Sequence, residues 1–282
     1  MNKIVLVADS TCDLSKEIIE QRNIKIIPLY VTFDENTYRD GVDITTKELY
    51  EKVEQTGKLP KTSAISPGDF ISFFEPFIEE GNEVIYISIG SKLSGTYNSA
   101  NLAKDSFDDG KITVIDSKNL SSGIGLLVLK ASDMINKGMT PKEIKEAVEL
   151  LVPKVRSQFA IPTLDYLYKG GRCSTLSMLV GGVLLVKPII QVKDGAMDVY
   201  KKAMGKMTRA LDIMLDDYEA LKDEIDDTYV MITHSIAEKS SQYMIEEVNR
   251  RYQPKQLIET QAGCVISSHC GKGTIGILYL MK

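Results

Sequence analysis

Five short clusters of polar residues contain the side chains that could bind or transform a ligand. Hydroxyl groups are frequent in the first three clusters, an arginine follows two glycines in the fourth, and a histidine precedes two glycines in the fifth. Hydroxyls, backbone N–H groups, guanidinium and imidazole are groups with which proteins bind carboxylates and phosphates. The clusters occupy residues 9–13, 60–67, 90–100, 164–174 and 269–274.

The third cluster predicts an anion site at the start of a helix. Residues 84–89 are a continuous apolar run, typical of a buried strand, and a helical pattern begins at about Gly95. A helix N-terminus exposes unpaired N–H groups and partial positive charge, and a glycine there lets the backbone approach a ligand. Ser94 and Thr96 add hydroxyl groups. The cluster matches neither the Walker pattern nor G-x-G-x-x-G, so dinucleotide binding is unsupported and a carboxylate or phosphate is expected.

The fourth and fifth clusters each hold one candidate ligand-binding side chain. Gly170 and Gly171 are expected to end a helical turn, so that Arg172 projects from a tight loop, where it could form a fork with a carboxylate. An exposed, merely solubilising arginine is the alternative. His269 is expected in a loop before the last strand, either as a ligand-binding group or as a surface or structural histidine.

The first two clusters support a ligand site or helix capping. Ser10 and Asp13 follow the first predicted strand, where ligands of open parallel sheets bind, but both could instead cap the next helix. Thr62 and Ser63 place two adjacent hydroxyls before a helix that Ser66 is expected to cap. Hydroxyl-rich loops before helices are common, so this second pattern alone is unspecific.

A catalytic triad or a metal centre is not expected. The pattern G-x-S-x-G does not occur, and no cofactor is predicted. Cys264, His269 and Cys270 could in principle bind zinc, but adjacent ligands at positions 269 and 270 are poorly placed to hold one ion. Buried or incidental thiols are the preferred interpretation.

Strands that alternate with helices predict a mostly parallel α/β sheet in the first half of the chain. Leu14–Arg22 reads as a helix with Asp13 as its N-cap, and Thr45 or Thr46 is expected to cap a helix with Glu48 in its first turn. The other expected strands are 4–8, 24–33, 84–89 and 112–115, and the other expected helices are 67–80, from about 95, 120–136 and 141–151.

After Pro153 the pattern changes to a mixed or antiparallel sheet with helices. Asp194-Gly195 between two β-rich runs, 189–192 and 197–203, predicts a hairpin. The other expected strands are 158–161, 229–233, 257–260 and 274–280, with helices at 208–221 and 237–252. We therefore predict two α/β domains, residues 1–153 and 154–282.

Composition and charge exclude several classes of protein. The 282 residues are 43% hydrophobic and carry a formal charge of −5, which is typical of a globular chain and argues against general affinity for nucleic acid. The longest apolar run, 178–186, is interrupted by Gly181-Gly182, so no membrane span is expected. The N-terminus does not resemble a signal peptide, and a cytoplasmic location is expected.

One basic stripe stands out in this acidic chain. It is expected either to be a solvated face that offsets nearby aspartates, or to dock an acidic face of a protein partner or an anionic membrane surface. The stripe consists of Lys201, Lys202, Lys206 and Arg209.

In their order and spacing, the five clusters resemble the DegV family of bacterial lipid-binding proteins over essentially the whole chain. The motifs that carry the resemblance are Asp9-Ser10-Thr11-Cys12-Asp13, Leu93-Ser94-Gly95-Thr96-Tyr97, Lys169-Gly170-Gly171-Arg172, Lys187-Pro188-Ile189 and His269-x-Gly271-x-Gly273. The resemblance implies two α/β domains with a long-chain fatty acid between them. It also implies a non-enzymatic subunit of a fatty acid kinase system, in which a separate kinase subunit phosphorylates the bound acid with ATP for phospholipid synthesis.

The resemblance also implies a set of site residues. Thr62 and Ser94 match carboxylate-binding hydroxyls, and Arg172 and His269 match members of the surrounding polar network. The full expected fatty-acid-binding set is Thr62, Ser63, Ser94, Gly95, Thr96, Arg172 and His269. Apolar stretches that could line a tunnel are 124–129 and 176–186. The chain departs from the family pattern at Ala64-Ile65, Lys272 and Lys92, which could alter chain preference or loop rigidity.

Two other functions remain open at this stage. An autonomous small-molecule kinase or transferase could bind its substrate covalently through His269, although a phosphate loop and an acidic metal site are not recognisable. A lipid-sensing regulator could use the same pocket with a different partner.

Overall fold

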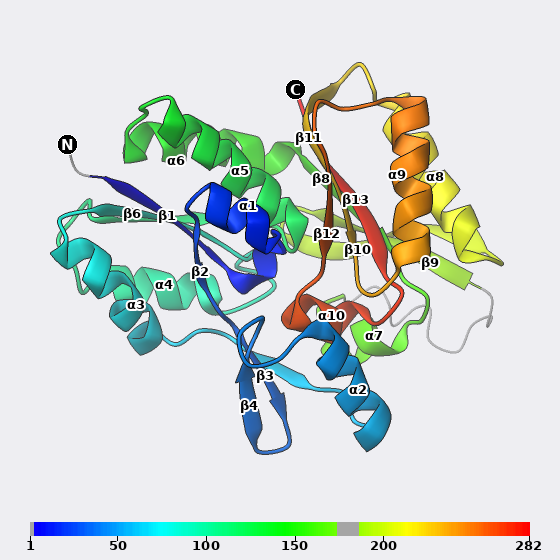
Figure 1. The fold of residues 1–282 in the computed structure, drawn as a ribbon, viewed down its shortest axis with the longest axis horizontal. Helices are drawn as coiled ribbons and strands as arrows, with labels where there is room; N and C mark the ends of the chain where they lie inside the picture. The colour runs from blue at the N-terminus through cyan, green and yellow to red at the C-terminus, as the bar shows by residue number, and fades with distance from the viewer. Residues whose placement is uncertain (1–2, 174–185) are drawn as a thin grey trace.

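The computed structural model describes residues 3–173 and 186–282 and contains three sheets surrounded by helices (Figure 1). The strands are β1 Ile4–Asp9, β2 Lys25–Ile27, β3 Tyr30–Phe33, β4 Asn36–Arg39, β5 Lys61–Ser63, β6 Glu83–Ser88, β7 Ile112–Asp116, β8 Val155–Ala160, β9 Val186–Lys193, β10 Ala196–Met204, β11 Ile225–His234, β12 Leu257–Gln261 and β13 Ile275–Met281. The α-helices are α1 Lys16–Gln21, α2 Thr46–Thr56, α3 Pro67–Glu79, α4 Thr96–Lys104, α5 Ser122–Asn136, α6 Pro141–Leu151, α7 Asp165–Gly170, α8 Met207–Ala220, α9 Glu238–Arg251 and α10 Cys264–Cys270. Two short 3-10 helices, η1 Ser10–Cys12 and η2 Val152–Lys154, complete the described elements.

The first half forms the predicted parallel sheet, in the order β2-β1-β6-β7. Its central strands are apolar on both faces because helices cover both. On one face α3 and α4 pack through residues such as Phe70 and Ala100, and on the other α5 and α6 pack through residues such as Leu127 and Ile144. The prediction of a helix-flanked parallel sheet is confirmed.

The second half forms a six-stranded mixed sheet, in the order β10-β9-β8-β13-β11-β12. Only β11 and β12 pair in parallel, and the other neighbours are antiparallel. The predicted hairpin is confirmed: Asp194 and Gly195 both have positive φ, as its tight turn requires. Helices α8 and α9 cover one face of this sheet. The mixed-sheet prediction is confirmed, and the domain boundary at residue 153 remains a prediction.

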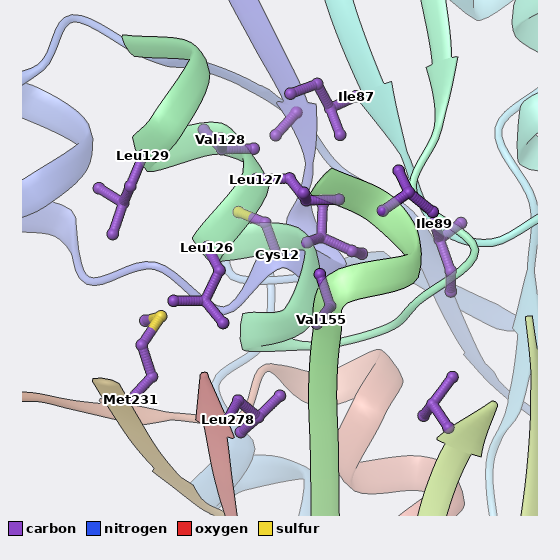
Figure 2. Close-up of a cluster of buried hydrophobic side chains, with 14 of the residues drawn as sticks. Cys12, Ile87, Ile89, Leu126, Leu127, Val128, Leu129, Val155, Met231 and Leu278 are labelled. Carbon is purple, nitrogen blue, oxygen red and sulfur yellow. The ribbon is translucent and has the colours of Figure 1, made fainter. Parts of the chain in front are cut away.

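Helix α5 lies between the two large sheets and joins their cores. Figure 2 shows its side chains Leu126 and Leu127 in one cluster with Ile87 of the parallel sheet and Leu278 of the mixed sheet. The helix approaches η1 closely, because a Cβ at Gly125 would lie 2.9 Å from the Cys12 carbonyl oxygen. One continuous apolar core therefore fixes the relative position of the two sheets.

Helix caps show where local prediction succeeds and where it fails. Thr45 and Ser66 cap α2 and α3 as expected, and each forms a capping box, with Glu48 and Asp69 respectively. The expected caps Asp13 and Ser10 are wrong, because Ser15 caps α1. The Asp13 carboxylate instead binds residues far away in sequence, and the Ser10 hydroxyl donates to Asp40.

Two further features have no counterpart in the sequence-based prediction. The small antiparallel sheet β4-β3-β5 forms from residues that were expected as one long strand and a loop. Helix α10 forms where a loop was expected, and it lies against β3, β5 and α2 (Figure 1). Among the described residues, no helix combines the length and the apolar composition that a bilayer crossing requires.

Candidate functional site

A cavity of about 170 Å³ lies where segments of both halves of the chain meet. Six of the seven expected site residues line it: Thr62, Ser63, Ser94, Gly95, Arg172 and His269. They come from β5, the loop before α4, the segment after α7, and α10. The fold therefore brings together residues that are up to 207 positions apart in sequence, as between Thr62 and His269.

Thr62 and His269 are directly hydrogen-bonded across the two halves. Their Oγ1 and Nε2 atoms are 2.8 Å apart. Pairing of β5 with β3 places Thr62 opposite Val31, which is fully buried and fixes the strand. The threonine hydroxyl can accept from or donate to the imidazole, and its remaining hydrogen-bonding capacity is available to a ligand.

Ser94 stands at the entrance to α4, as the sequence predicts. Its Oγ lies 2.8 Å from Thr96 Oγ1 and accepts from the Thr96 N–H at 3.3 Å. Thr96 is fully buried and does not line the cavity, so the structure places it behind Ser94. Gly95, at the N-cap position of α4, provides no side-chain cap, so Ser94 accepts from the first helical N–H and the N–H groups that follow Thr96 stay uncapped by Gly95.

His269 lies on α10, so the expectation that it occupies a loop is wrong. Burial and the nearby Arg172 charge lower the pKa of its imidazole to about 4, and the ring is neutral at pH 7. Its buried Nδ1 atom has no hydrogen-bond partner among residues 3–173 and 186–282. The ring packs against the end of α7, where a Cβ at Gly170 would lie 2.4 Å from Nδ1. A glycine at position 170 is therefore required for this approach.

Arg172 follows the glycine pair as expected. Gly171, with φ of +69°, ends α7 in the left-handed conformation that favours glycine. The Arg172 Nη1 atom donates to the Gly170 carbonyl oxygen at 2.7 Å. This bond holds the guanidinium at the cavity wall, beside His269, where its charge can attract an anion.

The rest of the cavity is largely apolar. Residues from both halves contribute: Leu29, Ile89, Leu93, Leu120, Phe159, Leu167, Met197, Val265 and Leu278. The expectation that 124–129 lines a tunnel is wrong, because these residues of α5 pack into the shared core. Most of the other expected stretch, 176–186, lies outside the described residues.

The sequence did not predict the burial of three carboxylates, two of which belong to the first cluster. Asp9, Asp13 and Asp40 are each at most 5% exposed. Burial raises the pKa of all three carboxyls, most strongly for Asp13. Asp9 accepts from the Ile89 N–H at 2.9 Å and from the Tyr86 hydroxyl at 2.7 Å. The other two accept from backbone N–H groups at the start of α10.

The thiols near the site are engaged with backbone carbonyls. Cys264 Sγ donates to Ile44 O, and Cys270 Sγ donates to Gly271 O. Burial raises the pKa of the Cys270 thiol to about 12, so it is not a thiolate at pH 7. Within residues 3–173 and 186–282, no three His, Cys, Asp or Glu side chains are grouped to hold a metal ion.

The four basic residues of the predicted stripe do not share one environment. Lys201 Nζ binds the Asp217 carboxylate at 2.7 Å, which is the local charge balance expected for a solvated face. Lys202, the next residue of β10, points to the opposite face of the sheet. Lys206 and Arg209, at the start of α8, are exposed.

The three departures from the family pattern have identifiable positions. Lys92 Nζ donates at 2.8 Å to the Asp194 carbonyl in the β9–β10 turn, which ties the loop before Ser94 to the mixed sheet. Lys272 forms an exposed ion pair with Glu54. Ala64 lines the cavity, and Ile65 is buried in the core.

Comparison with known proteins decides the family. The family model for uncharacterised proteins of the DegV family matches residues 3–282. The chain belongs to the DegV family. It is 35% identical, over 282 residues and the full length of both chains, to a DegV domain-containing protein of Caldanaerobacter subterraneus subsp. tengcongensis. The resemblance inferred from the five clusters is confirmed.

Solved DegV-family structures share the whole architecture. The fold matches a DegV family protein from Thermus thermophilus, described as binding fatty acid, with a TM-score of 0.93, 30% identity, and coverage of 99% of this chain and 100% of that chain. It also matches a stearic-acid-binding protein from Eubacterium ventriosum with a TM-score of 0.89, 31% identity, and coverage of 100% and 99%. The arrangement of the parallel and the mixed sheet is thus shared with these DegV-family structures.

Proposed function

We propose that this protein binds a long-chain fatty acid in the cavity and presents its carboxylate to a separate kinase subunit. The observation that carries the proposal is one cavity that combines the Thr62 and Ser94 hydroxyls with a largely apolar lining. Fatty acid binding by DegV relatives of similar structure supports it. The protein itself acts as a carrier and not as an enzyme.

The carboxylate is held without a metal ion. A buried carboxylate must be hydrogen-bonded or paired, and two hydroxyls, the open N-terminus of α4 and the Arg172 charge can meet this requirement. Ser63 and Gly95 complete the wall around the head group. The hydrogen bond to the neutral His269 ring holds the Thr62 hydroxyl in one orientation.

The tail is held by apolar burial. Each methylene removed from water contributes about 0.8 kcal/mol, so the affinity rises with the length of chain that the apolar lining buries. This term gives affinity, whereas the polar end gives orientation. Together, burial of the tail and binding of the polar end hold the fatty acid with its carboxylate at a defined position.

The kinase step is assigned to a partner. The sequence contains no recognisable Walker-type phosphate-binding loop. In the proposed reaction the γ-phosphoryl group of ATP is transferred to a carboxylate oxygen, which yields an acyl phosphate and ADP. Lys202, Lys206 and Arg209 form the proposed basic contact for an acidic face of the kinase.

The test uses the delipidated protein, a long-chain fatty acid and ATP, with and without a fatty acid kinase subunit. Acyl phosphate is trapped with hydroxylamine as a hydroxamate and measured by mass spectrometry. The proposal predicts hydroxamate only when all four components are present. ATP-dependent product from this chain and a fatty acid alone would instead establish the autonomous kinase.

A further inference from the structure

Two buried carboxylates from the N-terminal half hold the first residues of α10. Asp40 Oδ1 accepts from the Cys264 N–H at 2.7 Å, and Asp13 Oδ1 accepts from the Gly263 N–H at 2.8 Å. Asp40 and Asp13 are 3% and 5% exposed. Neither carboxylate belongs to an ion pair among the described residues. Their main partners are therefore hydroxyls and the N–H groups at the start of α10.

The two carboxylates converge on Gly263. Asp13 has φ of +51°, the left-handed conformation, which turns its side chain away from α1. Ser121 donates to Asp13 at 2.5 Å and Ser10 donates to Asp40 at 2.9 Å, which orients both groups. A Cβ at Gly263 would lie 3.1 Å from both Asp40 oxygens and 3.3 Å from Asp13 Oδ1. Only a glycine fits between them without displacement.

The remainder of α10 is also bound to the N-terminal half. Thr46 Oγ1 donates to the Ala262 carbonyl at 2.8 Å, and the Tyr50 hydroxyl donates to the Ser267 carbonyl at 3.3 Å. At the far end, His269 Nε2 meets Thr62 Oγ1. Yet α10 is connected in sequence to β12 and β13 of the mixed sheet. The helix is thus bound to the N-terminal half near its start, in its middle and near its end, in addition to its contacts with α7 and Ser235 of its own half.

We infer that Asp13 and Asp40 are positioning residues for His269, acting through α10. The helix has seven residues and spans roughly 10 Å, so we expect a shift at its start to reach His269, one residue before its end. A shift of the start of α10 would move the His269 ring away from Thr62 and away from its close contact with Gly170. It also displaces Val265 and Ile266 of the cavity wall. The effect on fatty acid retention rests on the proposed function, whereas the effect on the ring does not.

The test compares Asp40→Asn and Asp13→Asn with Asp9→Asn as the matched control. Asp9 is also buried and accepts from Thr11, Tyr86 and Ile89, but it has no bond to α10. The chain has only two histidines, His234 and His269, so NMR of the ring nitrogens reports on each. Both α10 variants are expected to shift the His269 signals and to raise its pKa from about 4 toward its ordinary value, with His234 unchanged. Asp9→Asn should lower the melting temperature without moving His269.

The same two α10 variants are expected to release a bound fatty acid about tenfold faster than the wild type. Unchanged His269 signals in folded Asp40→Asn and Asp13→Asn, or an equal shift in Asp9→Asn, would overturn the inference. If the carboxylate variants do not fold, the His269 signals of Gly263→Ala test the inference. This substitution pushes the Asp13 and Asp40 carboxylates away from the start of α10 without removing either charge. A wild-type protein that binds no fatty acid would refute the proposed function, while the His269 signals still decide the positioning role.

Discussion

At the residue scale, two hydroxyls carry most of the proposed recognition of the carboxylate. Thr62→Ala and Ser94→Ala should each weaken fatty acid binding roughly tenfold or more, because a hydrogen bond to a charged group contributes about 1.5–3 kcal/mol. The measurement is a fluorescent fatty acid displacement titration. The matched control is Thr32→Ala, which removes an exposed hydroxyl from neighbouring β3, outside the cavity. Wild-type affinity in both site variants would place the carboxylate elsewhere.

His269 should make the protein less stable in mild acid. The folded-state pKa of about 4 lies below the ordinary value of 6.5, so the unfolded chain binds a proton that the folded chain excludes. The free energy of unfolding should therefore fall as the pH drops from about 6.5 to about 4, and this contribution should then level off. Urea unfolding at several pH values, compared between wild type and His269→Gln, measures it. Parallel curves for the two proteins would show that the ring titrates normally.

At the element scale, the fit of α7 against α10 depends on a missing side chain. Gly170→Ala should destabilise the protein by about 1–3 kcal/mol, because its Cβ would overlap the His269 ring and force the helices apart. Gly68→Ala is the matched control: a Cβ there finds its nearest neighbour at 3.8 Å in the first turn of α3. It should be neutral or stabilising by up to about 1 kcal/mol. Similar melting temperatures for both variants would contradict the close packing.

A helix cap could be predicted from the sequence when the capping residue and its partner are close in the chain. Glu48 lies three residues after Thr45, so their capping box is readable in sequence and is confirmed. Asp13 was misassigned because its partner Gly263 is 250 residues away. Helix α10 was missed because it is short, is rich in Ser and Cys, and has no side-chain cap of its own. Its N-terminus is capped instead by tertiary contacts, which no local pattern reveals.

At the scale of the whole molecule, the cavity depends on how the two halves are joined. The apolar core around α5 provides one joint. A polar joint lies at one end of α5, where Arg22 binds Asp133 and the Tyr229 hydroxyl, and Lys130 binds Asp226. Arg22 Cζ and Lys130 Nζ each lie 5.6 Å from the centroid of the Tyr229 ring, so both cations interact with its face. Four of the five clusters line one cavity, and they could be assigned to one site from sequence only through the family, because these joints create their meeting point.

The proposed kinase contact makes a prediction about salt. Charge reversal at Lys202, Lys206 and Arg209 should leave fatty acid occupancy intact and lower phosphorylation by the partner, most strongly at low ionic strength, since surface charges are screened beyond about 8 Å at physiological salt. Lys201→Glu is a useful comparison, because Lys201 is already paired with Asp217. Kinase turnover is measured against salt concentration with each protein preloaded with the same fatty acid. Equal phosphorylation rates for the wild type and the charge-reversal variant at low salt would show that these residues are only a solvated face.

The central proposal is that the cavity holds a long-chain fatty acid, and the most direct measurement is mass spectrometry of an organic extract of the purified protein. Wild-type protein should yield a long-chain fatty acid in near-stoichiometric amount, and the double variant Thr62→Ala/Ser94→Ala should yield clearly less. An extract without any acyl species, together with no binding of added long-chain fatty acids by the folded protein, would contradict it.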